Sequence, residues 1–390
     1  MKPLRGALPA AAAALALAAL LAGAGGSALG VCGPFTDVSD ATFCPFVLEI
    51  FTLGITTGTS ATTYSPNESV SRLQMAAFLS RGVDGALKRG SRRAALRHFW
   101  TAQSDATLGL TTVGANPHLL QSDGLDIWVA EGNGTVSRVR APSGNLLGTW
   151  TGAEGPEGIL VATGRVLITS SSNNPGKLFA IDPSEPPSAV ATVSSQLGAG
   201  PEGITFDGGR VWTSNGPGHS VSIVTPGPSY PWTVTTVTTG FQGPFGALYD
   251  GSNVWVTDVL GNTLLRLDPA GVILQTVTVG DFPAHPAFDG TNLWVPNTHG
   301  ASVTVVRAAT GAVLATLTGN GLGQPFDAAF DGERVMVTSG TSDMVSLWKA
   351  ADLTPLGFVF TGKGSRPTGV CSDGVSFWIT LNTFGQIARL

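Results

Sequence analysis

The amino-acid sequence predicts an all-β fold, a seven-bladed β-propeller over residues 105–390, preceded by a small α-helical module. A stretch like PEGITFDGGRVWTSN, at 201–215, occurs seven times. Each copy has one large apolar residue at the position of Trp212, which we call the anchor. The anchors recur at intervals of about 42 residues, the length expected for a four-stranded propeller blade. The last copy lacks a strand, and a matching strand precedes the first copy. The anchors are Trp128, Leu167, Trp212, Trp255, Trp294, Met336 and Trp378.

Each repeat divides into four short strands. A Pro-led segment such as PEGITFD alternates in the manner of a strand, and Asp-Gly then makes a tight hairpin turn, because Gly tolerates positive φ. The second strand carries the anchor, and two more follow, such as TLLRLD at 263–268 and then VILQTVTVG. One blade cannot bury both of its faces alone. We therefore expect neighbouring blades to stack around a central axis, with the anchors filling the space between them.

The two ends of the repeat array predict that the propeller closes into a ring. The last unit ends at Leu390, just after its third strand, QIARL. The segment ATLGLTTVG at 106–114 resembles a fourth strand and lies before the first unit. We expect this N-terminal strand to complete the last blade, which hides sheet edges that would otherwise invite aggregation.

The first thirty residues are typical of a secretory signal peptide. Lys2 and Arg5 form a positive n-region, an Ala/Leu-rich apolar stretch follows, and Ala28-Leu29-Gly30 is a small-x-small cleavage site. An uncleaved membrane anchor is the alternative. This segment predicts an exported protein, periplasmic, at the cell surface or extracellular. The net charge of −5 argues against nucleic acid as a partner.

Residues 31–82 are predicted to form the small helical module. FCPFVLEIFTLGI carries apolar residues at helical spacing and stops at Gly54. VSRLQMAAFLSR is a second amphipathic helix, with Ser71 as its N-cap. The intervening TTYSPNES is rich in turn-forming residues.

This module resembles the S-layer homology domain. It has the Phe-x-Asp-Val start, the Gly-Ile that closes the first helix, the aromatic-x-Pro and a hydroxyl-Arg pair opening the second helix. The resemblance implies binding to a cell-wall polysaccharide or peptidoglycan-linked polymer: Arg72 would bind an acidic glycan group, and Asp37 would hold the pocket. The planar fork of Arg suits carboxylates. A purely structural helical cap is the alternative. The matching residues are Phe35, Asp37, Val38, Gly54, Ile55, Gly58, Tyr64, Pro66, Ser71 and Arg72.

A basic linker is expected at residues 83–104, because five Lys and Arg residues lie close together there. Such runs are mostly solvated, and contact with an anionic wall polymer or with lipid headgroups is the alternative. The basic residues are Lys88, Arg89, Arg92, Arg93 and Arg97.

The three cysteines indicate one disulfide and one free thiol. An export signal permits disulfides, and Cys32 and Cys44 are close enough in sequence to pair. Cys371 lies in a repeat strand and is expected to be a buried free thiol. None of the three has metal-ligand spacing.

Two sets of repeat positions are candidates for a ligand site at the channel. The residue after each Pro gives His118, Glu157 and Glu202, and the third residue after each anchor gives a second polar set. Carboxylates that converge with a His bind a divalent cation such as Mg²⁺ or Ca²⁺, here through Glu157 and Glu202, or act as acid and base. Solvated residues that bond to the next blade are the alternative. The second set includes Glu131, Asn215, Asp258 and Asn297.

Over about residues 113–390 the repeat resembles the streptogramin (virginiamycin B) lyase-like propellers and the related YVTN (YncE-like) repeats. Pro117-His118, Trp128 and Glu131 come closest to the lyase pattern. That resemblance implies a His that acts as general acid or base, with acidic residues holding a magnesium ion. His118 and Glu131 are the candidate catalytic residues.

The sequence carries no complete catalytic set, so the predicted function is a non-enzymatic binding scaffold at the cell envelope. It would be tethered through the helical module and would bind an unknown protein or small molecule at the channel. A lyase-like or other metal-assisted enzyme at one end of the channel is the alternative.

Overall fold

The computed structural model describes residues 32, 34–40, 43–52, 56–72, 74–79, 82 and 109–390. The expected signal peptide, Gly54-Ile55 and the basic linker lie outside these residues. The chain divides into two compact units, Met1–Trp100 and Thr101–Leu390, which are considered separately. In the described part of the chain, no helix has the length and apolar character needed to cross a membrane.

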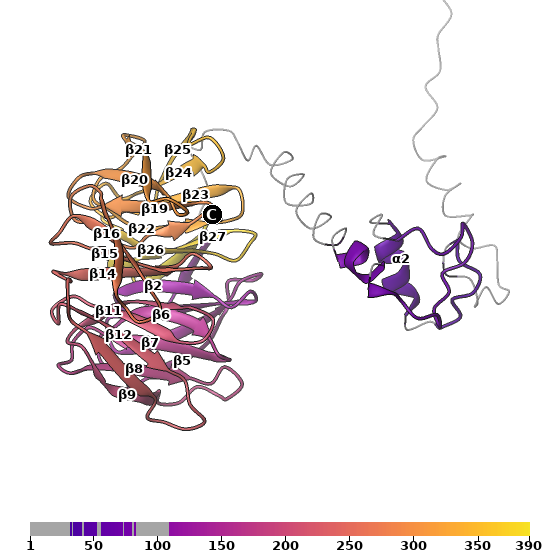
Figure 1. Ribbon diagram of the computed structural model, residues 1–390, viewed down its shortest axis with the longest axis horizontal. Helices are drawn as coiled ribbons and strands as arrows, with labels where there is room; N and C mark the ends of the chain where they lie inside the picture. The colour runs from indigo at the N-terminus through magenta and orange to yellow at the C-terminus, as the bar shows by residue number, and fades with distance from the viewer. Residues whose placement is uncertain are drawn as a thin grey trace, which may run out of the picture. The chain divides into compact units, whose positions relative to one another are not determined.

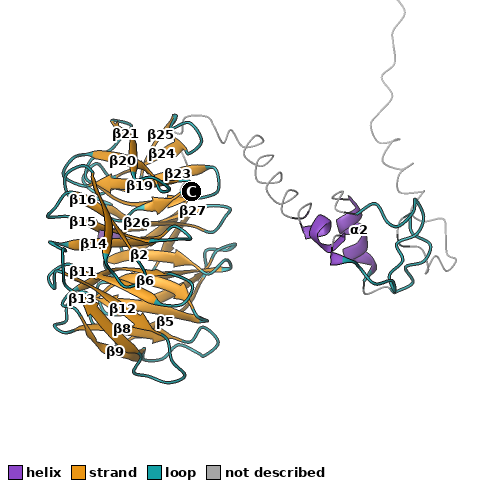
Figure 2. Ribbon diagram, viewed as in Figure 1, coloured by secondary structure: helices purple, strands orange, loops and turns teal. Residues whose placement is uncertain are grey.

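The larger unit consists of seven four-stranded antiparallel sheets, confirming the predicted seven-bladed β-propeller (Figures 1 and 2). Blade 1 contains β2 (Pro117–Ser122), β3 (Asp126–Glu131), β4 (Thr135–Arg140) and β5 (Leu146–Thr151). Blade 2 contains β6 (Pro156–Ala162), β7 (Arg165–Ser170), β8 (Gly176–Ile181) and β9 (Ala191–Leu197). Blade 3 contains β10 (Pro201–Phe206), β11 (Val211–Asn215), β12 (Ser220–Thr225) and β13 (Thr233–Val237).

The remaining blades follow the same order. Blade 4 contains β14 (Pro244–Tyr249), β15 (Val254–Asp258), β16 (Thr263–Leu267) and β17 (Ile273–Thr278). Blade 5 contains β18 (Ala287–Phe288), β19 (Asn292–Asn297), β20 (Ser302–Arg307) and β21 (Ala312–Thr318). Blade 6 contains β22 (Pro325–Phe330), β23 (Arg334–Ser339), β24 (Met344–Lys349) and β25 (Pro355–Phe360). Blade 7 contains β26 (Pro367–Ser372), β27 (Phe377–Leu381), β28 (Gln386–Arg389) and β1 (Gly109–Thr112), with the 3₁₀-helix η1 (Asn382–Phe384) before β28.

The N-terminal strand closes the ring as predicted. β1 is the outer strand of blade 7 and pairs antiparallel with β28, from Gly109 opposite Arg389 to Thr112 opposite Gln386. The last blade is therefore completed by residues from the opposite end of the propeller sequence. This pairing satisfies the backbone edge of β28.

The recurring Asp-Gly and Trp of the repeat are joined by a hydrogen bond. In blade 4 the indole Nε1 of Trp255 donates to Asp250 Oδ2 over 2.7 Å, while Asp250 Oδ1 accepts the backbone N–H of Asn253 in the hairpin turn. One carboxylate thus fixes both the turn and the buried anchor, which is 0% exposed. The same Trp–Asp bond joins Trp128 to Asp123, Trp212 to Asp207, Trp294 to Asp289 and Trp378 to Asp373.

The two blades without a Trp anchor lack this bond. Leu167 replaces Trp in blade 2, where the turn has no Asp before Gly164. Met336 replaces it in blade 6, where Asp331 accepts a hydrogen bond from Arg334 Nε instead. The repeat Asp therefore bonds to the indole where the anchor is Trp, whereas it is absent from blade 2 and bonds to Arg334 in blade 6.

A second recurring contact joins each blade to the next. In blade 4, Thr257 Oγ1 accepts the N–H of Gly246 and donates to the carbonyl oxygen of Ala284 in blade 5. A Cβ on Gly246 would lie 2.6 Å from that same oxygen, so a side chain at this position would push the blades apart. Equivalent donors reach the next blade from Thr169 to Glu202, Ser214 to Phe245, Thr338 to Thr368 and Thr380 to His118.

The small module has its own apolar core around Phe35, which packs 5.2 Å from Phe51 and 5.6 Å from Tyr64 between ring centroids. Its described helix α2 (Cys44–Thr52) begins at Cys44, which forms the predicted disulfide with Cys32. Ser71 also caps the second helical segment as predicted, since Gln74 N–H donates to Ser71 Oγ and Ser71 N–H donates to Gln74 Oε1.

Replacing Trp255 with Phe tests the Trp–Asp bond. Trp255→Phe keeps an aromatic side chain but removes the donor to Asp250, so we expect the free energy of unfolding to fall by about 2 kcal/mol. Met336→Leu, at the equivalent position without such a bond, should cost less than about 1.5 kcal/mol. Urea unfolding followed by circular dichroism measures both. Equal losses in the two variants would show that the hydrogen bond contributes nothing beyond packing.

Candidate functional site at the channel mouth

The innermost strands of the blades surround a cavity of about 670 Å³ at the end where these strands begin. It brings together three of the predicted site residues, His118, Glu157 and Glu202, from three successive blades. Phe245, Phe326 and Thr368, which follow the Pro in blades 4, 6 and 7, line the same cavity. Residues that the repeat pattern did not indicate complete the lining: Asn116, Gly132, Ser171, Thr298, Gln324, Gly340, Arg366, Pro367 and Asn382.

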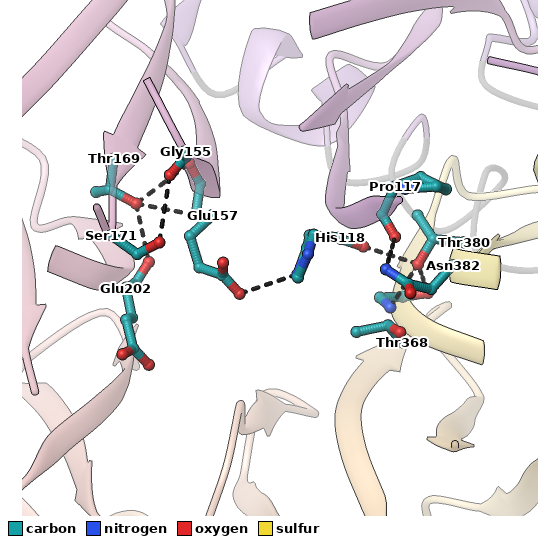
Figure 3. Close-up of polar contacts among 12 residues, drawn as sticks. Pro117, His118, Gly155, Glu157, Thr169, Ser171, Glu202, Thr368, Thr380 and Asn382 are labelled. Atoms are coloured by element: carbon teal, nitrogen blue, oxygen red, sulfur yellow. Dashed lines mark hydrogen bonds and ion pairs between the residues drawn. The ribbon is translucent and has the colours of Figure 1, made fainter. Parts of the chain in front are cut away.

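His118 and Glu157 form an ion pair across the boundary between blades 1 and 2 (Figure 3). His118 Nδ1 lies 3.1 Å from Glu157 Oε1. The adjacent carboxylate of Glu157 raises the pKa of His118 above its ordinary value, although burial acts in the opposite direction. Asn382 Nδ2 donates to the carbonyl of Pro117, and Thr380 Oγ1 donates to that of His118. The seam between blades 7 and 1 therefore positions this histidine.

Glu202 lies on the other side of Glu157 (Figure 3). Its backbone carbonyl accepts a hydrogen bond from Thr169 Oγ1 over 3.0 Å, but its carboxyl has no hydrogen-bond or ion-pair partner among the described residues. Burial, with a smaller contribution from the charge of Glu157, raises the pKa of Glu202 to about 7. This carboxyl is consequently a proton donor or an anion near neutral pH.

Aromatic side chains form the opposite side of the cavity. The ring centroids of Phe245 and Phe326 lie 5.8 Å apart in an edge-to-face arrangement, and His285 packs against both at 4.8 and 5.1 Å. Burial lowers the pKa of His285 to about 4, so its imidazole is neutral at physiological pH. Its Nε2 atom has no hydrogen-bond partner in the described structure.

A second, smaller cavity of about 330 Å³ occupies the channel beyond this aromatic group. His285, Asp327 and Cys371 contribute to its lining. Burial raises the pKa of Asp327 to about 8, although its carboxylate accepts hydrogen bonds from the N–H groups of Ala328 and Val370. Cys371 is a buried free thiol, as predicted.

A break in the repeat pattern marks this cavity in the sequence. Four first strands begin Pro-x-Gly, whereas blade 1 has Pro117-His118-Leu119 and blades 5 and 6 have Pro283-Ala284-His285 and Pro325-Phe326-Asp327. In blades 5 and 6, polar side chains replace Gly at a position where the inter-blade distance is short. A break in a repeat at the channel indicates a changed lining.

Four residues of the second polar set, for which ligand-binding or catalytic roles were predicted, are not among the residues that line the channel-mouth cavity. Glu131, Asn215, Asp258 and Asn297 are all at most 1% exposed. Each lies at the end of the second strand, where its side chain bonds to the segment that leads into its blade or to the neighbouring third strand. Glu131 Oε1 accepts Gly114 N–H, and Asp258 accepts the N–H groups of Gln242 and Gly243.

The two amides act in the same way. Asn297 Oδ1 accepts the N–H of Gly280, and its Nδ2 donates to Ser302 and Thr304. Asn215 Nδ2 donates to Ser220 and Ser222. These residues anchor the chain within each blade, a role that side-chain type and spacing alone do not distinguish from ligand binding.

Asp37 and Arg72, the predicted glycan-binding residues of the small module, lie in different environments. Asp37 accepts hydrogen bonds from the backbone N–H groups of Tyr64 and Ser65 at 2.8 and 2.7 Å. The bond from Tyr64 lowers the pKa of Asp37 below its ordinary value, with that from Ser65 adding to the effect against burial. Asp37 thus fixes the turn-rich loop. Arg72 is exposed at the start of the second helical segment.

The channel residues do not form a metal site of three protein ligands. Within residues 109–390 and the described part of the small module, no three His, Cys, Asp or Glu side chains are grouped so that they could hold an ion. Glu157 is paired with His118, which leaves Glu202 as a single additional oxygen ligand. We therefore derive no metal-dependent step.

The fold and the module define a propeller chain with a cell-surface domain. Residues 34–76 match the family model of the S-layer homology domain, as the sequence predicted. Domains of this family generally bind cell-wall polymers, which suggests anchoring at the cell surface. A sequence match of 41% identity over 51 residues links the chain to an endoglucanase from Bacillus sp. (strain KSM-635). This match spans 13% of the chain and 5% of the endoglucanase.

The propeller is similar in structure to solved lyase structures and to a WD40 propeller domain. A streptogramin B lyase structure matches with a TM-score of 0.61 and 16% identity, covering 73% of this chain and 96% of that one. Virginiamycin B lyase from Staphylococcus aureus matches with a TM-score of 0.62 and 16% identity, covering 73% and 98%. The WD40 propeller domain of Doa1 matches with a TM-score of 0.58 and 12% identity, covering 73% and 97%. Identities this low establish the fold alone.

The pKa of Glu202 predicts a pH-dependent cost to stability. Because the folded-state pKa, about 7, exceeds the ordinary value of 4.5, ionisation of Glu202 destabilises the fold increasingly as the pH rises between these values. Glu202→Gln should raise the free energy of unfolding by about 3 kcal/mol at pH 8 and leave it unchanged at pH 4. Urea titrations at both pH values measure this. Glu185→Gln, at an exposed loop position, is the matched control, and an identical pH profile in both variants would contradict the assignment.

Proposed function

We propose that this protein is an exported, envelope-associated β-propeller that binds a ligand at its channel mouth and is tethered to the cell wall through its S-layer homology domain. The polymer would be a wall polysaccharide or a peptidoglycan-linked polymer. The propeller would act as a binding scaffold rather than as an enzyme.

The tether is supported by the family match and by the exposure of Arg72. An exposed guanidinium at the start of a helical segment is available to an acidic glycan group, whereas Asp37 is committed to the loop at Tyr64 and Ser65. The N-terminal segment, with its positive n-region and apolar h-region, supports export.

The observation that carries the binding role is the contrast between two sets of polar side chains. The four acidic and amide residues discussed above at the ends of the second strands are buried and hydrogen-bonded through their side chains, as Asp258 illustrates with its bonds to Gln242 and Gly243. Glu202 and Arg366 line a cavity of about 670 Å³ and have no such bonds through their side chains in the described structure. Unused polar groups in a concave site are the usual mark of ligand binding.

Replacing Arg72 tests the tether. Arg72→Ala should reduce co-sedimentation of the full-length protein with purified cell walls by about tenfold, because it removes a charge-assisted bidentate contact. Arg72→Lys should retain part of the binding, and Lys363→Ala, an exposed cation on the propeller, should retain all of it. Sedimentation of Arg72→Ala at the wild-type level would show that this arginine does not contact the polymer.

A lyase-like activity is the second candidate, and the His118–Glu157 pair favours it. A His that faces a carboxylate in a cavity is equipped for proton transfer. The other candidate catalytic residue, Glu131, is buried and accepts hydrogen bonds from Gly114 and Thr135. It is therefore not available to a substrate.

We expect the protein to leave virginiamycin B intact over hours at micromolar protein concentration, with and without Mg²⁺. Liquid chromatography with tandem mass spectrometry measures this, because ring opening by elimination leaves the mass unchanged. Glu131 makes no contact with the cavity that would allow it to take part. Ring opening by the wild-type protein that is lost in His118→Ala would overturn the scaffold proposal. Ring opening retained in His118→Ala would indicate a contaminating activity.

A further inference from the structure

The channel-mouth cavity has two chemically different sides. His118 of β2, Glu157 of β6 and Glu202 of β10 line the side formed by blades 1–3. Phe245 of β14 and Phe326 of β22 line the side formed by blades 4 and 6. A ligand that fills the cavity therefore meets carboxyl groups on one side and aromatic rings on the other.

The charged side chains on the polar side differ in whether they have a partner. His118 and Glu157 compensate each other at 3.1 Å. Glu202 is next to this pair, yet no donor reaches its carboxyl from any described residue. A partly buried carboxylate without a donor is costly, because it loses hydration and gains no hydrogen bond in return. The missing partner for Glu202 is a hydrogen-bond donor that carries positive charge.

The aromatic side suits the same kind of ligand. Phe245 and Phe326 are in edge-to-face contact, and the imidazole of His285 packs against both rings, so the surface is rigid and largely apolar. Aromatic faces attract both apolar groups and cations. A ligand with a cationic end and an apolar body would satisfy both sides at once.

We infer that this cavity binds a primary ammonium group joined to an aromatic or apolar body, with the ammonium at Glu202 and the body against Phe245 and Phe326. This inference rests on the proposed ligand-binding role of the channel mouth and names the ligand class. Free organic amines and the ammonium groups of peptides share this chemistry. An ammonium donates up to three hydrogen bonds and needs no second protein carboxylate.

The other charged groups around the cavity determine whether each substitution should strengthen or weaken amine binding. Arg366 lines the rim, where its exposed guanidinium repels a cation weakly because solvent and salt screen it. The charges of His118 and Glu157 offset each other. His285, packed behind the two Phe rings, is neutral because burial lowers its pKa to about 4. Glu202 is thus the group that should dominate amine affinity.

Isothermal titration calorimetry of the full-length protein with phenethylamine at pH 7 tests the inference. Phenethylamine should bind at least about tenfold more tightly than 2-phenylethanol, which lacks the charge, or ethylamine, which lacks the ring. Glu202→Gln should weaken phenethylamine about tenfold and Phe326→Ala about fivefold. Arg366→Gln should strengthen it about twofold. The matched control Glu185→Gln should change nothing.

The pH dependence supplies an independent readout. Because an ammonium stabilises the ionised carboxyl, binding at pH 7 should release about half a proton per amine, measured from the dependence of the binding enthalpy on the buffer. Affinity should rise about tenfold between pH 6 and pH 8 as Glu202 ionises. Deprotonation of His118 acts in the same direction, so the part of the proton release that is lost in the Glu202→Gln variant isolates the contribution of Glu202.

Three outcomes would overturn the inference. The first is equal binding of phenethylamine and 2-phenylethanol. The second is amine binding that is unchanged in Glu202→Gln. The third is binding of MgCl₂ alone at the cavity with the amine excluded. The proposed function is tested separately by incubating the protein with a solubilised envelope digest and identifying the retained molecules by mass spectrometry. Retention of non-amine ligands that is lost in Phe326→Ala would contradict the amine inference but support the binding role. No retention together with no amine binding would contradict both.

Discussion

The pairing of β1 with β28 is the contact on which the rest of the propeller depends. Without it, blade 7 would have three strands and an open edge at β28. The same closure brings blade 7 against blade 1, where Thr380 and Asn382 donate to the carbonyls of His118 and Pro117. The ring therefore closes at the place where the histidine of the channel mouth must be positioned. The boundary between blades 7 and 1 therefore both closes the ring and positions a residue of the candidate site.

Contacts that recur among the blades stabilise the ring, whereas positions that depart from the repeat line the channel. The Asp–Trp bond and the Thr–carbonyl contact recur because every blade must fix its first turn and meet its neighbour at a short distance. Glycine follows from that short distance at Gly246 and its equivalents. Leu119, His285 and Asp327 occupy this position without being Gly, and all three line the channel. The positions that the blades do not need for their own packing are the ones that determine the channel lining.

The chemistry at the channel mouth follows from how its charges are compensated. Glu157 is offset by His118, so its carboxylate is stable in a partly buried position. Glu202 has no comparable partner, and burial raises its pKa to about 7. The similar folds of the streptogramin and virginiamycin B lyases do not decide what this cavity binds, because ligand specificity depends on lining residues and not on blade number.

The sequence by itself determined the number of blades, the ring closure, the Ser71 cap and the pairing of Cys32 with Cys44. Each of these follows from local spacing: a period near 42 residues, a strand motif displaced to the other end, or two residues close in the chain. Only the tertiary structure decided which acidic residues are available to a ligand. Glu131 and Glu202 both occupy repeat positions that the sequence marked as candidates, yet Glu131 is held by Gly114 while Glu202 faces a cavity without a donor. The sequence could not separate them, because burial and hydrogen bonding depend on segments brought together by folding, and three different blades supply the polar side of the channel mouth.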